Sequence, residues 1–292
     1  MTADGKEFWR WSEGRWHDAT LDWRAAKSIT AGIDVGSVSS EAVLCLDGRL
    51  FAWNTIRTGS SSPEAARLAL DGALEEAGMP REAVNYIVGT GYGRVNVPFA
   101  DKTITEIACH GRGAHYIGGP FVRTILDMGG QDLKAIRIDE TGRVTDFLMN
   151  DKCAAGTGRG MEVIADLLEV PIGEIGERSF DIPEEPPAVS DVCVVFARTE
   201  AMARLKEGWS KNMVIASYCR AMAERVAALL KRLGVEKEFI ITGGISKNIG
   251  VVKRIEKIIG VTALKPSLDT QIAGALGAAL FAYDLHRKTL KR

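Results

Sequence analysis

The chain contains two stretches with the same local pattern, and this repeat constrains the fold more than any other feature. The first stretch covers 28–56 and the second covers 122–148. Each has three apolar segments joined by two short turns, the first of them an Asp-x-Gly turn, as three β-strands connected by tight hairpins do. Helical patterns follow at 63–77 and 159–168. The sequence therefore predicts an α/β fold with two duplicated mixed-sheet lobes that face each other across a cleft.

Later segments fit this two-lobed plan. The apolar spacing over 213–233 predicts a long amphipathic helix that ends at Gly234. The segment 238–242 reads as a short buried strand, and the small residues of 274–279 predict a closely packed helix. We expect a first lobe over 28–120 plus about 268–292, a second lobe over 121–267, and an extension over 1–27.

The extension is rich in tryptophan. Four of the six tryptophans lie in it, namely Trp9, Trp11, Trp16 and Trp23. One interpretation is a short hairpin whose rings cover an apolar patch of the same chain. The other is a docking arm for another subunit, because aromatic residues are enriched at interfaces. The sequence leaves both interpretations open.

Composition excludes several classes of function. The net charge is −1, from 37 basic and 38 acidic residues spread along the chain, so the basic footprint of a nucleic-acid binder or a membrane-surface protein is missing. The N-terminus lacks the apolar core of a signal peptide, and the apolar stretch 272–283 is too short to span a bilayer. Five widely spaced cysteines favour reduced thiols. We expect a soluble, cytoplasmic protein with no nucleic-acid or membrane partner.

Glycine turns beside carboxylates indicate a nucleotide site without a P-loop. The chain has no G-x-x-x-x-G-K-[ST] motif, which excludes a Walker-type NTPase. Asp34 and Asp127 each end a predicted strand, and each is followed two residues later by glycine. Such turns let backbone N–H groups approach phosphate oxygens, and the carboxylates can hold Mg²⁺ through water. Gly243-Gly244 after a third strand would let an adenosine lie against the backbone. The alternative is that all three are ordinary turns.

Three motifs together resemble those of a known superfamily. Asp34-Val-Gly36-Ser37, Asp127-Met-Gly129-Gly130-Gln131-Asp132 and Thr242-Gly243-Gly244-Ile245 resemble the phosphate-1, phosphate-2 and adenosine motifs of the acetate kinase, sugar kinase, Hsp70 and actin superfamily. The resemblance implies an actin-like ATPase that binds Mg·ATP between its lobes. It also implies that Gln131 and Asp132 lie near the γ-phosphate as catalytic residues that orient the attacking water. The implied cofactor-binding residues are Asp34, Gly36, Ser37, Val38, Ser39, Asp127, Gly129, Gly130, Gly156, Thr157, Gly158, Gly243, Gly244 and Ile245.

Two segments that each contain one cysteine narrow the resemblance from the superfamily to one family. Asn150-Asp-Lys-Cys153-Ala-Ala-Gly-Thr-Gly-Arg and Ser190-Asp-Val-Cys193-Val-Val-Phe-Ala resemble the benzoyl-CoA reductase and 2-hydroxyacyl-CoA dehydratase activator family. This resemblance implies that Cys153 and Cys193 bind a [4Fe–4S] cluster shared with a partner chain. Such a cluster normally needs four thiolates, which two copies of the site facing across a twofold axis can supply. We interpret Cys45, Cys109 and Cys219 as small buried apolar residues.

Details of the sequence favour one branch of that family. Dehydratase activators usually carry lysine at the position of Glu41. This departure and the Trp-rich extension resemble the smaller ATP-binding subunit (delta/gamma type) of ATP-dependent class I benzoyl-CoA reductase. The resemblance implies an ATP-dependent oxidoreductase subunit that takes electrons from ferredoxin and delivers them to substrate-reducing subunits that dearomatise benzoyl-CoA. The partner across the cluster would be a paralogous larger ATP-binding subunit or a second copy of the chain.

Three alternatives remain. The first is a homodimeric activator of a 2-hydroxyacyl-CoA dehydratase. The second is a sugar or N-acetylhexosamine kinase of the same superfamily, which would need a catalytic base in a sugar pocket and no iron. The third is an Hsp70- or actin-like interaction module, which is disfavoured because the chain has no peptide-binding domain or filament-scale insertion.

Overall fold

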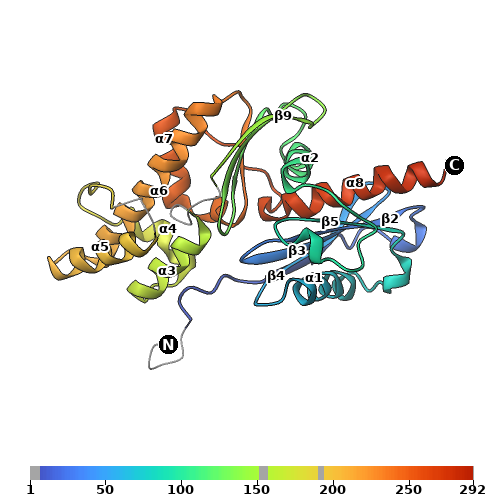
Figure 1. The fold of residues 1–292 in the computed structure, drawn as a ribbon, viewed down its shortest axis with the longest axis horizontal. Coiled ribbons are helices and arrows are strands. Elements are labelled where there is room, and N and C mark those ends of the chain that lie inside the picture. Colours follow the sequence, from blue (N-terminus) through green and yellow to red (C-terminus); the bar gives the residue numbers. More distant parts are fainter. Residues whose placement is uncertain (1–6, 151–156, 190–193, 292) are drawn as a thin grey trace. The chain divides into compact units, whose positions relative to one another are not determined.

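A computed structural model describes residues 7–150, 157–189 and 194–291 (Figure 1). The chain divides into two compact units. Unit 1 comprises Met1–Ser12, Leu126–Ala135 and Phe147–Leu264, and unit 2 comprises Glu13–Ile125, Ile136–Asp146 and Lys265–Arg292. The lobe boundaries expected from the sequence stay a prediction.

Unit 2 is built on a six-stranded mixed sheet in the order β1-β4-β3-β2-β5-β6. The neighbours β1 and β4, β4 and β3, and β3 and β2 are antiparallel, whereas β2 and β5 and then β5 and β6 are parallel. The mixed sheet and the two hairpins of the first stretch agree with the sequence prediction. The strands are β1 (Gly14–His17), β2 (Ile29–Val35), β3 (Ser39–Leu46), β4 (Arg49–Arg57), β5 (Tyr86–Thr90) and β6 (Lys102–Thr103).

Helices cover both faces of this sheet, which is why every residue of β2 is buried. α1 (Ser62–Glu76) packs its alanines and leucines on one face, and α8 (Ala273–Thr289) lies on the other, beside α2 (Glu106–Gly118) (Figure 1). The small residues of α8 allow a close approach, since a Cβ on Gly32 of β2 would overlap the backbone of Ala275 and Ala279. The predicted closely packed helix is therefore confirmed.

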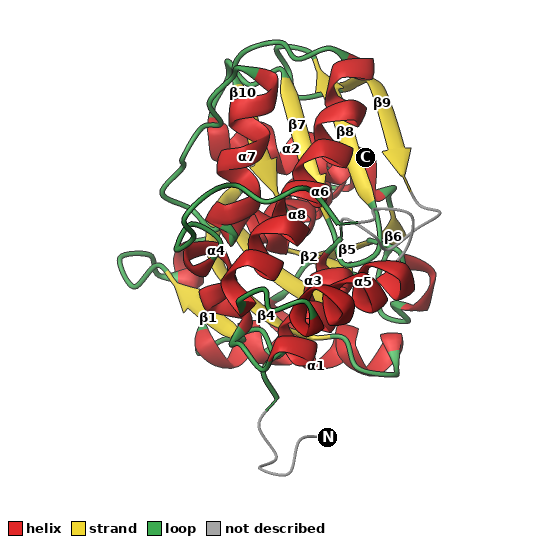
Figure 2. Ribbon diagram, turned by 90° about the vertical axis from the view of Figure 1, so that its left-hand side faces the viewer, coloured by secondary structure: helices red, strands yellow, loops and turns green. Residues whose placement is uncertain are grey.

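A second sheet has four strands in the order β10-β7-β8-β9. Its strands are β7 (Thr124–Met128), β8 (Leu133–Ile138), β9 (Val144–Asn150) and β10 (Phe239–Thr242). Figure 2 shows the four strands in this order, and residues of β10 and α7 belong to the same hydrophobic core. The helices of this unit are α3 (Gly158–Leu168), α4 (Ile175–Arg178), α5 (Val194–Lys206), α6 (Lys211–Leu233) and α7 (Ile249–Ile259).

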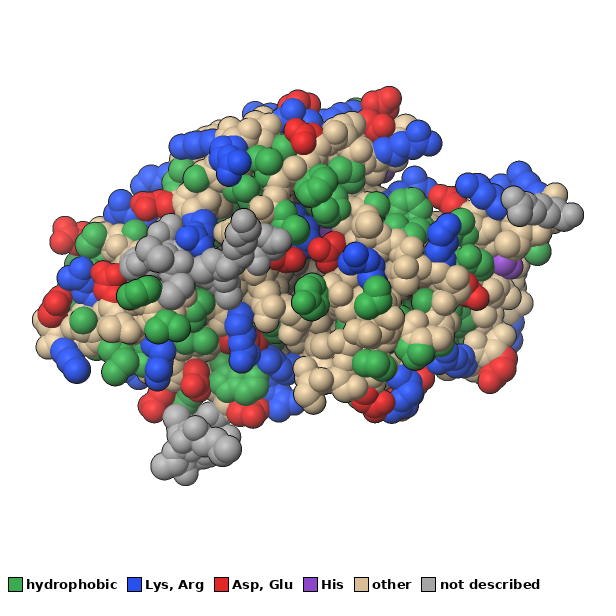
Figure 3. All heavy atoms as spheres, viewed as in Figure 1, with side chains coloured by type: hydrophobic (Ala, Val, Ile, Leu, Met, Phe, Trp, Pro, Cys, Tyr) green, Lys and Arg blue, Asp and Glu red, His purple; other side chains and the backbone are tan. Residues whose placement is uncertain are grey.

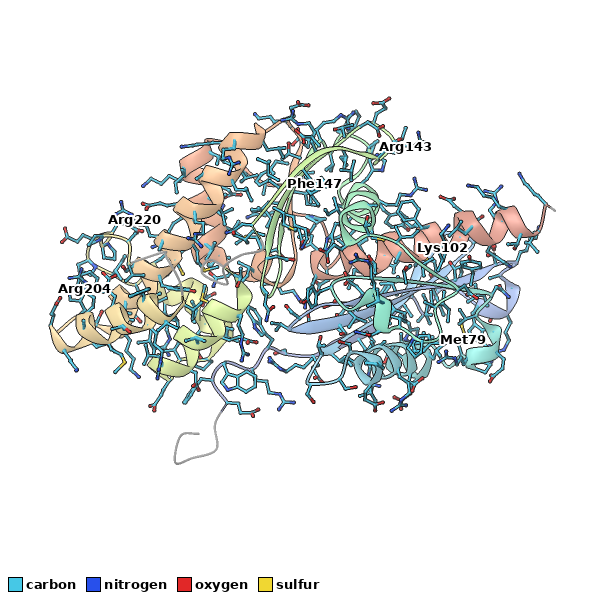
Figure 4. The ribbon with its side chains drawn as sticks, viewed as in Figure 1. Met79, Lys102, Arg143, Phe147, Arg204 and Arg220 are labelled. Atoms are coloured by element: carbon cyan, nitrogen blue, oxygen red, sulfur yellow. The ribbon has the colours of Figure 1, made fainter. Side chains whose placement is uncertain are left out.

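Local sequence sets the ends of α6. The Ser210 side chain accepts a hydrogen bond from Met213 N at the first turn, and Gly234 caps the C-terminus as predicted. Arg204 of α5 forms ion pairs with Glu200 of the same helix and with Glu207 just beyond its end, and Arg220 pairs with Glu224 on α6 (Figure 4). The apolar side of α6 packs into the core of unit 1.

Short 3₁₀ helices fill several connections. They are η1 (Trp23–Ala25), η2 (Arg81–Ala83), η3 (Arg94–Asn96), η4 (Ile172–Glu174), η5 (Gly244–Lys247) and η6 (Thr270–Ile272).

The described part of the Trp-rich extension does not form the expected hairpin. Its one strand, β1, pairs instead with β4. Trp9 and Trp11 pack against the core of unit 1, where Ile172 N donates to Phe8 O at 2.9 Å. Trp23 packs against the core of unit 2. These rings cover apolar patches of the same chain, and a docking role stays an untested prediction.

Among the described residues, we find no helix with the length and apolar character needed to cross a bilayer. On the face drawn in Figure 3, basic and acidic side chains are interspersed.

Candidate functional site

The turn between β2 and β3, residues 36–39, is closed by its own backbone. Gly36 N donates to Ser39 O at 3.0 Å, and Thr58 Oγ1 donates to Gly36 O at 2.8 Å. A Cβ on Gly36 would lie 2.6 Å from Ser39 O, so the turn needs glycine here. Ser37 and Val38 occupy the tip of this turn, and all four residues are half-buried. We call residues 36–39 the first turn.

Asp34, which precedes the first turn, is held in a slot of unit 2. A Cβ on Gly91 would overlap one carboxylate oxygen, and a Cβ on Gly274 would overlap the other. His110 Nε2 of α2 lies 3.7 Å from Asp34 Oδ2. Because Gly274 is in the first turn of α8, the carboxylate lies where a helix N-terminus favours negative charge. We call the space bounded by Gly91, His110 and Gly274 the Asp34 slot.

The turn between β7 and β8, residues 129–132, closes in the same way. Gly129 N donates to Asp132 O at 3.0 Å. A Cβ on Gly129 would lie 2.6 Å from Asp132 Oδ1, so glycine is again required. Gly130 and Asp132 are half-buried, and Gln131 is exposed. The shared closure agrees with the repeat seen in the sequence, and we call residues 129–132 the second turn.

Asp127, which precedes the second turn, has a buried cation beside it. Lys134 Nζ of β8 lies 3.4 Å from Asp127 Oδ2 and 2.7 Å from Asp132 Oδ1. Thr242 Oγ1 of β10 donates to Asp127 Oδ1 at 3.1 Å. Lys134 is not among the site residues predicted from the sequence, although a lysine within the apolar run that follows an acidic turn is a visible signal.

The Gly243-Gly244 pair lies against β7. Gly243 has a φ of +80°, and a Cβ there would meet Met128 O and lie 3.0 Å from Asp127 Oδ1. Ile245 is buried in η5. Unit 1 thus brings the predicted adenosine motif next to the predicted phosphate-2 motif.

The start of α3 rests on the second turn. Gly158 N donates to Gly129 O at 3.0 Å, and Arg159 N donates to Gly130 O at 2.8 Å. Thr157 is fully buried. The predicted site residues Gly156, Cys153 and Cys193 lie outside the described residues.

The three described cysteines are buried apolar residues. Burial raises the pKa of Cys45, Cys109 and Cys219 to about 12 in each case. They are therefore neutral thiols at ordinary pH, unlike the thiolates that bind iron. Within 7–150, 157–189 and 194–291, no group of three or more His, Cys, Asp or Glu side chains could hold a metal ion.

The donor set fits Mg²⁺ and a polyphosphate. Asp34 and Asp127 offer carboxylate oxygens, which are the ligands that Mg²⁺ prefers. Each lies beside a tight glycine turn whose backbone can approach phosphate oxygens. Which residues touch a nucleotide stays a prediction.

Known proteins are similar to this chain over most of its length. The profile of the BadF/BadG/BcrA/BcrD ATPase family matches residues 31–282, which begins after the Trp-rich extension. The activator of lactoyl-CoA dehydratase from Anaerotignum propionicum is 44% identical, over 89% of this chain and 99% of its own. A benzoyl-CoA reductase component from Thauera aromatica is 34% identical, over 89% of this chain and 95% of its own.

A solved structure is also similar. The activator of the 2-hydroxyisocaproyl-CoA dehydratase from Clostridium difficile, with bound ADPNP, superposes with a TM-score of 0.84 at 38% identity. The similarity covers 90% of this chain and 97% of that one. These relatives favour the dehydratase-activator alternative over the benzoyl-CoA reductase interpretation that the sequence details suggested. The chain belongs to the BadF/BadG/BcrA/BcrD ATPase family and has its actin-like ATPase fold.

Proposed function

We propose that the chain is the ATP-hydrolysing activator of a 2-hydroxyacyl-CoA dehydratase and acts as a homodimer in the cytoplasm. The observation that carries this proposal is the 44% identity to a dehydratase activator over 99% of that protein, against 34% to the reductase component. Its role as an ATPase follows from the family.

The environment of Glu41 weakens the main argument for the reductase. Glu41 is buried in β3, and its Oε1 accepts a hydrogen bond from Gln271 Nε2 at 3.1 Å. Gln271 also donates to Ser39 Oγ at 3.2 Å. Glu41 therefore joins β3 to η6 within unit 2. Its departure from the usual lysine has a packing reason and does not by itself identify the partner enzyme.

We propose that the carboxylate and the glycine turn of each repeat are the residues that bind Mg·ATP. Asp34 and Asp127 would hold Mg²⁺, and the backbone of the two turns would bind phosphate oxygens. Gly243, Gly244 and Ile245 border the adenosine. Gln131 and Asp132 are the candidates to orient the attacking water. The geometry within each unit is compatible with these roles, because each glycine turn begins two residues after its carboxylate.

Cys153 and Cys193 are the proposed cluster ligands, two from each copy. The cluster, when bound, supplies one-electron transfer at low potential. The chain next to Cys193 supports an interface there, since Val195 and Phe196 at the start of α5 are 72% and 61% exposed. Exposed apolar residues beside a predicted cluster ligand are typical of a surface that a second copy covers.

The second turn could pass a conformational change from the nucleotide site towards the proposed cluster. Gly158 and Arg159 donate to the carbonyls of Gly129 and Gly130, and Cys153 lies only a few residues before them in the chain. A change in the second turn on hydrolysis would move the start of α3, which follows Cys153 by a few residues in the sequence. We propose that this movement links ATP hydrolysis to electron delivery to the dehydratase.

A component of benzoyl-CoA reductase is the second candidate, supported by the 34% identity to the Thauera aromatica protein. Under that proposal, the partner would be a paralogous larger ATP-binding chain, ferredoxin the electron donor, and the recipients separate substrate-reducing subunits.

Anaerobic purification from the source cells distinguishes the two candidates. We expect a dimer of this chain alone which, once reduced and given ATP, activates a 2-hydroxyacyl-CoA dehydratase from the same cells. A complex with a second ATP-binding chain that reduces benzoyl-CoA would overturn the proposal in favour of the reductase.

A further inference from the structure

Lys134 occupies a buried position, where lysine is rare unless its charge is paired. It is the second residue of β8, between the fully buried Leu133 and Ala135, and its side chain is 3% exposed. An ammonium group loses its hydration at such a position, and the fold tolerates it only with good carboxylate partners.

Its two partners stand on either side of the second turn. Lys134 Nζ lies 2.7 Å from Asp132 Oδ1, at the end of the turn, and 3.4 Å from Asp127 Oδ2, just before it. One buried cation therefore bridges the carboxylates that flank the turn. All three residues belong to unit 1.

The Asp132 carboxylate points back over its own turn. Its Oδ1 lies so close to Gly129 that a Cβ there would come within 2.6 Å, and its carbonyl accepts from Gly129 N at 3.0 Å. Both the side chain and the backbone of Asp132 thus close the turn. Gln131, at the tip, is exposed.

We propose that Lys134 is a positioning residue, which holds Asp132 as the closing group of the second turn and leaves Gln131 alone to orient the attacking water. This inference rests on the proposed nucleotide site and divides its two catalytic candidates into different roles. Lys134 and Asp132 shape the backbone that receives the phosphates, so their loss weakens nucleotide binding. Gln131 acts only in the reaction, so its loss lowers kcat.

The test compares Lys134→Met, Lys134→Arg, Asp132→Asn and Gln131→Ala. Calorimetry gives the Kd for MgADP, and steady-state hydrolysis gives kcat and KM for MgATP. We expect Lys134→Met and Asp132→Asn each to weaken MgADP binding about tenfold or more, as the loss of a charge-assisted hydrogen bond does. Lys134→Arg should restore part of this loss. Gln131→Ala should lower kcat about a hundredfold at an unchanged Kd.

Lys253→Met is the matched control. Lys253 of α7 also forms a lysine–carboxylate pair, with Glu256 at 2.6 Å, but its side chain is 46% exposed, against 3% for Lys134. Its removal should leave Kd and kcat unchanged. The double variant Lys134→Met/Asp132→Asn should bind MgADP no more weakly than the worse single variant, because both changes break one interaction.

Two results would overturn the inference. One is a folded Lys134→Met protein that binds MgADP like the wild type. The other is an Asp132→Asn protein that loses kcat at an unchanged Kd, which would make Asp132 a catalytic residue. If Lys134→Met does not fold, Lys134→Arg and Asp132→Asn decide by the same two measurements.

The binding measurement separates this inference from the proposed function. If the wild type binds MgADP but activates no dehydratase, the proposed function fails, and the comparison of Kd values still decides the role of Lys134. If the wild type binds no nucleotide, the inference is overturned with the nucleotide site itself.

Discussion

Asp34 and Asp127 occupy equivalent positions in the two repeats, yet their surroundings differ. Each ends a buried strand and precedes a turn closed by the same backbone hydrogen bond. Around Asp34, two glycines and an imidazole form a close-fitting slot. Around Asp127, a buried lysine and a threonine hydroxyl contact the two carboxylate oxygens.

The difference shows that a repeated motif predicts backbone geometry better than it predicts the environment of a side chain. Asp127 has the buried ammonium of Lys134 beside it, whereas Asp34 has the imidazole of His110 at 3.7 Å and two glycines against its carboxylate oxygens. We therefore expect the two carboxylates to contribute unequally to Mg²⁺ binding, with Asp34 the more important.

The largest effect should come from replacing each of the two aspartates, Asp34 and Asp127, by asparagine in separate variants. Asp34→Asn should lower kcat by about 10²–10³ and raise the Mg²⁺ concentration needed for half-maximal hydrolysis. Asp127→Asn should change the Mg²⁺ requirement less but lower the thermal midpoint more, because it deprives buried Lys134 of a partner. Titration of hydrolysis with Mg²⁺ and thermal melts measure both effects. Equal shifts in the Mg²⁺ requirement would contradict the comparison.

A smaller effect should follow from filling the Asp34 slot. Gly274→Ala places a methyl group on Asp34 Oδ2, so we expect about tenfold weaker MgADP binding and about 1–3 kcal/mol lower free energy of unfolding. Gly173→Ala is the control, since a Cβ there meets nothing within 4 Å. Calorimetry and urea unfolding measure both quantities. If Gly274→Ala binds MgADP as Gly173→Ala does, the slot does not position Asp34.

The next largest effect concerns the reactivity of the cysteines, which differs between the buried thiols and the two predicted cluster ligands. Cys45 and Cys109 in unit 2 and Cys219 in unit 1 are buried, with pKa values raised to about 12. In iron-free folded protein at pH 8, we expect a thiol reagent to modify two of the five cysteines, Cys153 and Cys193, and to modify all five in urea. Peptide mapping identifies the modified residues. Rapid modification of Cys219 in folded protein would contradict this account.

The smallest effect concerns alkaline stability. Because burial raises the pKa of Cys219 from 9.0 to about 12, its neutral thiol contributes stability fully below pH 9, and this contribution is lost as the pH rises from 9 towards 12. The free energy of unfolding of the wild type should therefore fall more steeply over this window than that of Cys219→Ala. Urea unfolding at several pH values measures the two slopes, and equal slopes would show that the thiol does not contribute.

The sequence predicted the features that depend on neighbours along the chain. The Asp-x-Gly hairpins, α6 with its cap at Gly234, and the close packing of α8 all follow from local patterns. The Asp34 slot could not be predicted, because His110 and Gly274 reach Asp34 only through the packing of α2 and α8 on the sheet.

Two other residues show what local patterns can and cannot reveal. Lys134 could have been found, since it stands among apolar residues directly after an acidic turn. The short hairpin considered for the Trp-rich extension does not form in its described part, because β1 pairs with β4, far along the chain.

The content of iron and acid-labile sulfide in the anaerobically purified protein decides whether this chain carries an electron-transfer cluster. We predict an oxygen-sensitive [4Fe–4S] cluster at about one per two chains. It should be lost in Cys153→Ser or Cys193→Ser and retained in Cys219→Ser, which changes a buried thiol. A stable, iron-free protein that phosphorylates a sugar would contradict the account, leaving only the ATPase fold.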